Sequence, residues 1–120
     1  MMLNKQDKPA DFIVSTTQCA TVKEFAELSF REVGYNNIEW QGEGVDEKLI
    51  NKDDGHILLE VDPKFFRPGE VPYLRGSNKK IMDTLGWKPE NDWKVLLKEM
   101  IAYDLLLAER DAYIVKLKDT

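Results

Sequence analysis

This chain of 120 residues carries a formal net charge of -5 at pH 7, and 42% of its residues are hydrophobic, which fits one globular domain with a single core. The acidic balance argues against non-specific nucleic-acid binding, which needs a basic surface. A single cysteine, Cys19, excludes an internal disulfide and fits a reducing compartment such as the cytoplasm, and no apolar run is long enough to predict a membrane span.

The first part of the chain predicts a helix end, a strand and a helix. Residues 1–8 turn from apolar to polar before Pro9, like the last turn of a helix that begins further upstream. Residues 12–16 are rich in β-branched and aromatic side chains, which predicts a buried strand. The sequence TVKE at 21–24 is a capping box, and it opens a helix that we expect to end at Gly34 in a left-handed cap.

The middle of the chain predicts two further strands on either side of a charged loop. Residues 37–41 alternate between apolar and polar side chains, and residues 57–61 are mostly apolar. The intervening residues 45–55 are rich in charge. We expect a loop there that is long enough to act as a flap.

The last part of the chain predicts two helices and a tail. Ser77 can cap a short helix that Gly86 closes. Asn91 or Asp92 can cap the final and longest helix, in which apolar residues recur at i, i+3, i+4, i+7 and i+8. These core-facing residues are Trp93, Leu96, Leu97, Met100 and Ile101. The pattern then weakens, so we expect residues 111–120 to form a C-terminal tail.

Together these elements predict a small α+β domain of short strands and three helices, without the strand–helix alternation of a Rossmann unit. The chain has no G-x-G-x-x-G turn, no P-loop and no Tyr-x-x-x-Lys pair. Its single histidine, His56, has no cysteine cluster around it, so we expect no metal site. A nucleophile pair of Cys19 and His56 is formally allowed, but neither residue lies in a nucleophile context.

The sequence DPKFFRPGEV at 62–71 offers the clearest candidate ligand site. Arg67 carries a planar fork of donors that suits a phosphate, and Glu70 carries acceptors that suit sugar hydroxyls. Pro68 restricts the backbone beside Arg67, so both side chains would project from a stiff loop. A surface ion pair between Arg67 and Glu70 explains the same residues equally well.

Other residues near this sequence have two interpretations each. Trp40 lies on a predicted strand, where core packing is the simpler interpretation and base stacking is the alternative. If the chain is extended, Phe65 and Phe66 point to opposite faces, one towards the core and one towards the pocket. Arg75 is a candidate second phosphate ligand, although a solvated loop charge is the simpler interpretation.

Several stretches of the chain resemble the GDP-mannose 4,6-dehydratase family of extended short-chain dehydrogenases/reductases. They are PADFIVST at 9–16, TVKEF at 21–25, IEWQG at 38–42, VDPKFFRPGEV at 61–71, GSNKK at 76–80 and LGWKP at 85–89. The chain departs from the family at Thr17, where the family usually has glycine, and at Gly69, where it has a small side chain.

The resemblance implies that residues 9–110 form the family's substrate-binding domain and bind the GDP moiety of GDP-mannose. It implies that Arg67 contacts the diphosphate, that Glu70 contacts the ribose hydroxyls and that Trp40 lies beside the nucleotide. In the family, NADP and the catalytic residues belong to an N-terminal Rossmann domain. We therefore expect this chain to be a C-terminal fragment without catalytic or cofactor-binding residues.

The implied parent enzyme is a cytoplasmic lyase that dehydrates GDP-mannose to the 4-keto-6-deoxy sugar. Its expected partners are GDP-mannose or GDP and the Rossmann domain, and a homo-oligomer is compatible with the sequence. Two alternatives stay open. The chain is a non-catalytic interaction module that kept the fold, or the equivalent part of another nucleotide-sugar epimerase or dehydratase.

Overall fold

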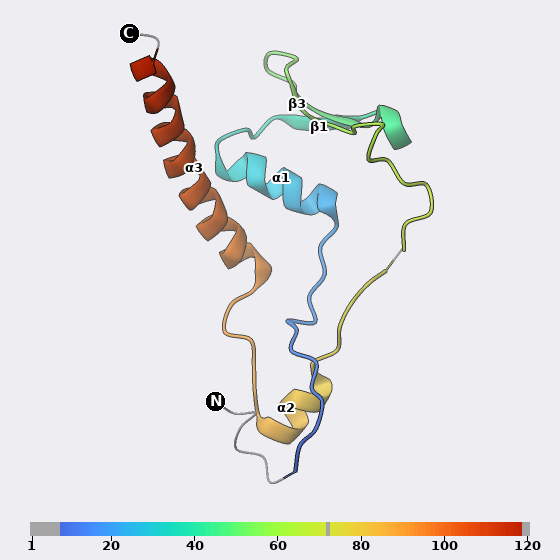
Figure 1. Ribbon diagram of the computed structural model, residues 1–120. Helices are drawn as coiled ribbons and strands as arrows, with labels where there is room; N and C mark the ends of the chain where they lie inside the picture. Colours follow the sequence, from blue (N-terminus) through green and yellow to red (C-terminus); the bar gives the residue numbers. More distant parts are fainter. Residues whose placement is uncertain (1–7, 72, 119–120) are drawn as a thin grey trace. The chain divides into compact units, whose positions relative to one another are not determined.

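The computed structural model describes residues 8–71 and 73–118 (Figure 1). In this part of the chain, three helices and a three-stranded sheet confirm the small α+β fold that the sequence predicts. The elements follow the order α1 (Val22–Glu32), β1 (Ile38–Gln41), the 3-10 turn η2 (Gly44–Asp46), β2 (Lys48–Asn51), β3 (Ile57–Glu60), α2 (Lys79–Leu85) and α3 (Trp93–Lys118). None of these described helices is long and apolar enough to cross a membrane.

The chain divides into two compact units. One is the uninterrupted stretch Val22–Pro72, which contains α1 and the sheet. The other combines Met1–Thr21 with Tyr73–Thr120 and contains α2 and α3. The helix end predicted at residues 1–8 lies outside the described residues, except for Lys8.

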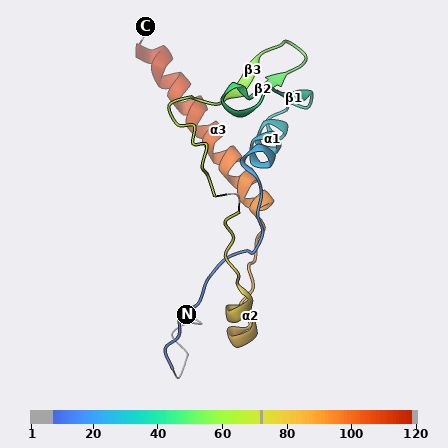
Figure 2. The same ribbon diagram turned by 90° about the vertical axis from the view of Figure 1, so that its right-hand side faces the viewer.

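The sheet is antiparallel, in the order β1-β2-β3 (Figure 2). Its central residue is Leu49 on β2. This side chain is fully buried, and it lies opposite Trp40 on β1 and Leu59 on β3. The predicted strands at residues 37–41 and 57–61 are confirmed as β1 and β3. The core of this unit is therefore built on the middle strand.

The expectation of a charged flap at residues 45–55 is wrong, because β2 lies within it. Only Leu49 and Ile50 are apolar in this four-residue strand, so the local pattern resembles a loop. The strands on each side supply hydrogen-bond partners for its backbone N–H and carbonyl groups. The residue pattern of one strand does not reveal this pairing. Asn51 is also buried, and its Oδ1 accepts a hydrogen bond from the backbone N–H of Asp53 over 3.3 Å.

The glycine stops of the two shorter helices are confirmed. Gly34 follows α1 with φ 101°, and Gly86 caps α2 with φ 67° while its N–H donates to the Met82 carbonyl over 2.9 Å. The start of α2 differs from the prediction, because Asn78 and not Ser77 occupies the cap position. Asn78 is buried, and its Nδ2 donates to the Ser15 carbonyl over 2.8 Å.

Residues 12–16 lie in an irregular segment, so the strand predicted there is wrong. In the described part of the chain no backbone ladder joins this segment to another. Instead, Ser15 Oγ donates to the Gly76 carbonyl over 2.9 Å, and Lys80 Nζ donates to the Asp11 carbonyl over 2.8 Å. A β-branched run becomes a strand only where a second backbone pairs with it.

Helix α3 begins as predicted but is less buried than its pattern indicates. Asp92 Oδ1 accepts from the backbone N–H groups of Lys94 and Val95 at 2.9 and 3.0 Å, which confirms Asp92 as the cap. Of the predicted core-facing residues Leu97 is buried, whereas the other leucine and the methionine of that group are exposed. The segment expected to be a C-terminal tail is helical as far as Lys118.

Candidate functional site

The candidate ligand loop follows β3 directly and is fixed at its start by a turn at Asp62. The Val61 N–H donates to the Glu47 carbonyl over 3.2 Å, which ties the loop to the segment before β2. Asp62 then accepts two hydrogen bonds, from the Lys64 N–H to its Oδ1 over 2.9 Å and from the Phe65 N–H to its carbonyl over 3.0 Å. The backbone is thus anchored a few residues before Arg67.

Arg67 and Glu70 are both exposed beyond this turn. Within the described residues, no hydrogen bond or ion pair joins either side chain to another residue. The alternative of a surface ion pair between Arg67 and Glu70 is therefore not seen in the structure. The guanidinium donors of Arg67 and the carboxylate acceptors of Glu70 are left for solvent or for a ligand.

Neither aromatic residue of the loop is a core residue, contrary to the prediction. Phe65 is 70% exposed and Phe66 is 44% exposed. The turn at Asp62 interrupts the extended backbone on which the prediction of alternating faces depended. Lys64 Nζ lies 5.3 Å from the ring centroid of Phe65, so this lysine covers part of the ring.

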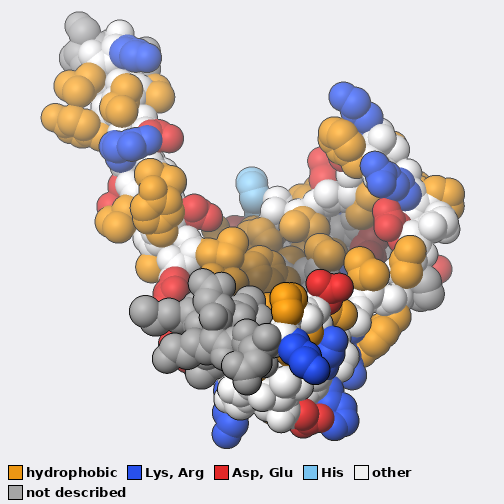
Figure 3. Space-filling model, turned by 60° about the horizontal axis from the view of Figure 1, so that its bottom comes forward, with side chains coloured by type: hydrophobic (Ala, Val, Ile, Leu, Met, Phe, Trp, Pro, Cys, Tyr) orange, Lys and Arg blue, Asp and Glu red, His pale blue; other side chains and the backbone are white. Residues whose placement is uncertain are grey.

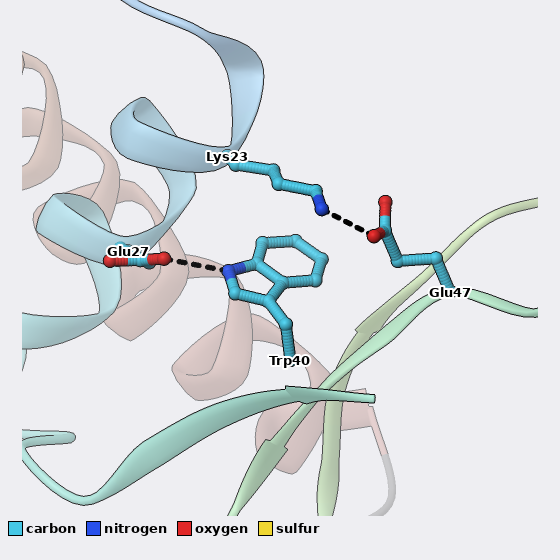
Figure 4. Close-up of polar contacts among 4 residues, drawn as sticks. All are labelled: Lys23, Glu27, Trp40 and Glu47. Atoms are coloured by element: carbon cyan, nitrogen blue, oxygen red, sulfur yellow. Dashed lines mark hydrogen bonds and ion pairs between the residues drawn. The ribbon is translucent and has the colours of Figure 1, made fainter. Parts of the chain in front are cut away.

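Trp40 lies in a polar cluster that joins α1 to the sheet (Figure 4). Its Nε1–H donates to Glu27 Oε1 over 2.8 Å, and Lys23 Nζ lies 5.1 Å from its ring centroid. Lys23 also forms an ion pair with Glu47. The indole N–H of half-buried Trp40 is thus bound by a residue of α1, and the Lys23 ammonium lies over its ring. These contacts show that Trp40 holds α1 against the sheet. Stacking of a nucleotide base on its ring stays a prediction.

Arg75 belongs to the other compact unit and is exposed. Its Nη1 donates to the Tyr73 hydroxyl over 3.3 Å, and its guanidinium carbon lies 5.8 Å from the Tyr73 ring centroid. This arrangement is typical of a loop arginine that rests on a neighbouring aromatic ring.

The two remaining candidates for chemistry, His56 and Cys19, belong to different compact units. His56 sits in the turn between β2 and β3, where its N–H donates to Asp54 Oδ1 over 2.9 Å. Cys19 is exposed in the other unit, and its Sγ lies 3.9 Å from the Leu74 carbonyl oxygen. Across residues 8–71 and 73–118, no group of three or more His, Cys, Asp or Glu side chains could hold a metal ion.

One groove was not predicted from the sequence. It has a volume of about 530 Å³ and is bordered by residues 14–16 and 86–91. Its position depends on an irregular segment that the sequence presents as a strand. Directly after it, Thr17 has φ 58°, in the left-handed region that disfavours β-branched residues.

Comparison with known proteins places this fold and this loop in a family. The family model described as GDP-mannose 4,6 dehydratase matches residues 1–100, which include Arg67, Glu70 and Trp40. The chain belongs to the GDP-mannose 4,6-dehydratase family. The resemblance of its sequence motifs to this family is thereby confirmed.

Individual relatives agree with this membership. The chain is 44% identical to GDP-mannose 4,6 dehydratase 2 of Caenorhabditis elegans over 107 residues, which are 89% of this chain and 28% of that protein. It is 39% identical to a GDP-mannose 4,6-dehydratase of Sinorhizobium fredii, over 87% of this chain and 29% of that protein. A Vibrio cholerae GDP-mannose 4,6-dehydratase is 38% identical over 96% of this chain and 33% of its own length. The chain therefore spans about a third or less of the length of these dehydratases.

Proposed function

We propose that residues 9–110 supply the GDP-binding part of a GDP-mannose 4,6-dehydratase and correspond to its C-terminal substrate-binding domain. One observation carries this proposal. Arg67 and Glu70 follow an anchored turn, lie within the family match, and have no hydrogen-bonding or ion-pair partner in the described part of the chain.

The two side chains would bind different parts of the nucleotide. The Arg67 guanidinium would donate to oxygens of the diphosphate, for which its planar fork and permanent charge are suited. The Glu70 carboxylate would accept hydrogen bonds from the ribose hydroxyls. A hydrogen bond to a charged group contributes about 1.5–3 kcal/mol, which corresponds to roughly a tenfold to hundredfold change in affinity.

Trp40 and Arg75 have lesser parts in this proposal. Since Glu27 holds the indole N–H of Trp40, any contact of Trp40 with the nucleotide would be made by the ring. Arg75 stays a candidate phosphate ligand, and binding a phosphate would cost it its contact with Tyr73.

The complete reaction would be the dehydration of GDP-mannose to the 4-keto-6-deoxy sugar in the cytoplasm, by an enzyme of the lyase class that uses NADP. The sequence of this chain does not fit NADP, because it contains no G-x-G-x-x-G turn. We assign the cofactor and the catalytic residues to an N-terminal Rossmann domain of the full-length enzyme. No step of the reaction is assigned to residues of this chain beyond holding GDP.

A titration of the 120-residue chain with GDP and with UDP, followed by amide chemical shifts or Trp fluorescence, tests this proposal. We expect weak binding that favours GDP, and at least a ~10-fold loss of GDP affinity in Arg67→Ala. Lys64→Ala is the matched control, because it removes an exposed positive charge from the same loop. Equal responses to the two nucleotides, or GDP binding that survives Arg67→Ala, would contradict it.

The same titration separates the alternatives. A preference for UDP would indicate the equivalent part of another nucleotide-sugar epimerase or dehydratase. No response to either nucleotide would favour a non-catalytic interaction module that kept the fold.

A further inference from the structure

The loop that carries Arg67 and Glu70 contains two successive turns, and they are held differently. The first turn is fastened by the two hydrogen bonds that Asp62 accepts. The second turn is formed by Pro68 and Gly69, so Arg67 and Glu70 stand at its two ends. Within the described residues, no backbone hydrogen bond of ordinary geometry closes this second turn. The separation of Arg67 from Glu70 therefore depends mainly on the backbone preferences of the two residues between them.

Gly69 does not have a conformation that requires glycine. The other four glycines of the unit Val22–Pro72 have positive φ, whereas Gly69 does not. A Cβ added to Gly69 would meet no described atom of this unit within 4 Å. A residue with a side chain would therefore fit the turn without strain, and the resemblance to the family indicates a small side chain at this position. The glycine contributes conformational freedom here and not a shape that only glycine adopts.

Freedom at Gly69 affects binding because one nucleotide would engage two side chains at once. The ring of Pro68 fixes φ in the first half of the turn. Rotation at Gly69 is then the main way in which the Arg67 guanidinium and the Glu70 carboxylate can move apart. A ligand that binds both groups selects one conformation of this backbone, and the freedom lost in that selection lowers the affinity.

We propose that Gly69 lowers the affinity of this chain for GDP by leaving Arg67 and Glu70 loosely held until a nucleotide bridges them. The inference rests on the proposed function, because the ligand is the same nucleotide, with its diphosphate at Arg67 and its ribose at Glu70. It adds that binding orders the site. Gly69 is a positioning residue in this arrangement and makes no contact with the nucleotide itself.

Gly69→Ala distinguishes a loose turn from a preformed one. Alanine has fewer backbone conformations than glycine, and the benefit appears at the step in which the turn becomes ordered. If binding orders the turn, GDP affinity rises by about two- to fivefold, while the urea midpoint of the nucleotide-free chain is unchanged. If folding already orders it, the midpoint rises by roughly 0.2–0.5 M and the affinity is unchanged. We expect the first result, and the second would overturn the proposal.

Backbone relaxation of the nucleotide-free chain, measured by NMR, tests the same point without a ligand. We expect amide order parameters below ~0.6 at Gly69 and Glu70. Lys64 and Phe65 should have values near ~0.85, because Asp62 accepts hydrogen bonds from their amides. Gly69→Ala should raise the first two values and leave the other two unchanged. Equal order in both turns of the unchanged chain would contradict the proposal.

The relaxation experiment also separates this proposal from the function on which it rests. If the unchanged chain binds no GDP, the proposed function fails, and the order parameters alone decide whether Gly69 loosens the turn. If the chain binds GDP and both turns are equally ordered, the proposed function stands and the role of Gly69 is wrong.

A double-mutant cycle with Glu70→Ala shows whether the gain acts through the pair of side chains. Without the carboxylate, Arg67 is the single anchor, so Gly69→Ala should leave the remaining GDP affinity unchanged. A gain that persists would mean that the added methyl group contacts the nucleotide. Weaker GDP binding in Gly69→Ala would mean that the glycine admits a close approach of the ligand. Either result would overturn the proposal.

Inorganic pyrophosphate is the matched ligand, because it has the two phosphates but no ribose. It would engage Arg67 and not Glu70, so Gly69→Ala should leave its binding unchanged. A gain with pyrophosphate as large as the gain with GDP would contradict the proposal. Helix α3 offers no dense basic patch that would compete for phosphate, because its Lys and Arg side chains are interspersed with hydrophobic and acidic ones (Figure 3).

Discussion

At the scale of single residues, Gly42 has the tightest surroundings of the glycines. Its φ is 79°, and a Cβ on it would lie 2.4 Å from the backbone carbonyl oxygen of Asp46. The turn that leads from β1 into η2 therefore needs a residue without a side chain. Since the contact is with backbone, no rotation of a side chain relieves it.

Gly42→Ala should lower the free energy of unfolding by more than the cost of placing an L-residue in the left-handed backbone conformation. Gly55→Ala is the matched control, because Gly55 has φ 74° but no atom within 4 Å of the added Cβ. The left-handed conformation costs an L-residue about 1–2 kcal/mol in both variants. We expect Gly42→Ala to lose at least ~1 kcal/mol more in urea unfolding. Equal losses would show that the turn adjusts freely.

At Thr17 a residue with a side chain occupies a backbone conformation that suits glycine. A β-branched residue with φ 58° stands at the position where the resemblance to the family indicates glycine. Its Oγ1 donates to the Thr16 carbonyl over 2.6 Å, which is a local and exposed contact. The strain of this conformation is of the order of 1–2 kcal/mol.

Thr17→Gly should therefore raise the free energy of unfolding by ~0.5–1 kcal/mol. This net gain is the relieved strain minus the cost of the greater backbone entropy that glycine gives the unfolded chain. Thr16→Gly should instead lower it, because Thr16 has no positive φ to relieve. Thermal unfolding of the two variants compares them directly. A loss of stability in Thr17→Gly as large as that in Thr16→Gly would refute the interpretation.

At the scale of elements, the contact between Trp40 and Glu27 fastens α1 to β1. Trp40→Phe keeps an aromatic ring but removes the N–H, so it should lower the free energy of unfolding by about 1–2 kcal/mol. A double-mutant cycle with Glu27→Ala isolates the pair, and we expect a coupling energy of at least ~0.5 kcal/mol in urea unfolding. Strictly additive losses would mean that the hydrogen bond contributes nothing.

The elements that the sequence predicts correctly are those with local signals. Asp92 begins α3 and the glycines at 34 and 86 follow α1 and α2, because caps and stops depend on a few adjacent residues. Strand β2 was missed because it contains only two apolar residues and depends on partners from elsewhere in the chain. The strand expected at residues 12–16 is absent for the converse reason, since no backbone among the described residues pairs with this apolar run.

At the scale of the whole molecule, the sequence names candidate ligand residues but not their surroundings. Arg67 and Glu70 are chosen from side-chain chemistry and from the motif around them, and their contact with GDP stays a prediction. The exposure of Phe65 and Phe66 could not be predicted, because it follows from the turn at Asp62. The burial of α3 was overestimated because periodicity identifies an apolar face but not what covers it.

The uninterrupted unit Val22–Pro72 has a genetic consequence. It contains Arg67, Glu70 and Trp40, whereas Arg75 belongs to the unit made of two separate stretches. One contiguous exchange of coding sequence between related genes would therefore transfer the first three residues together with the sheet and helix that hold them. Arg75 would remain with the recipient. These three candidate ligand residues could thus be inherited as a block, while the segments on either side diverge independently.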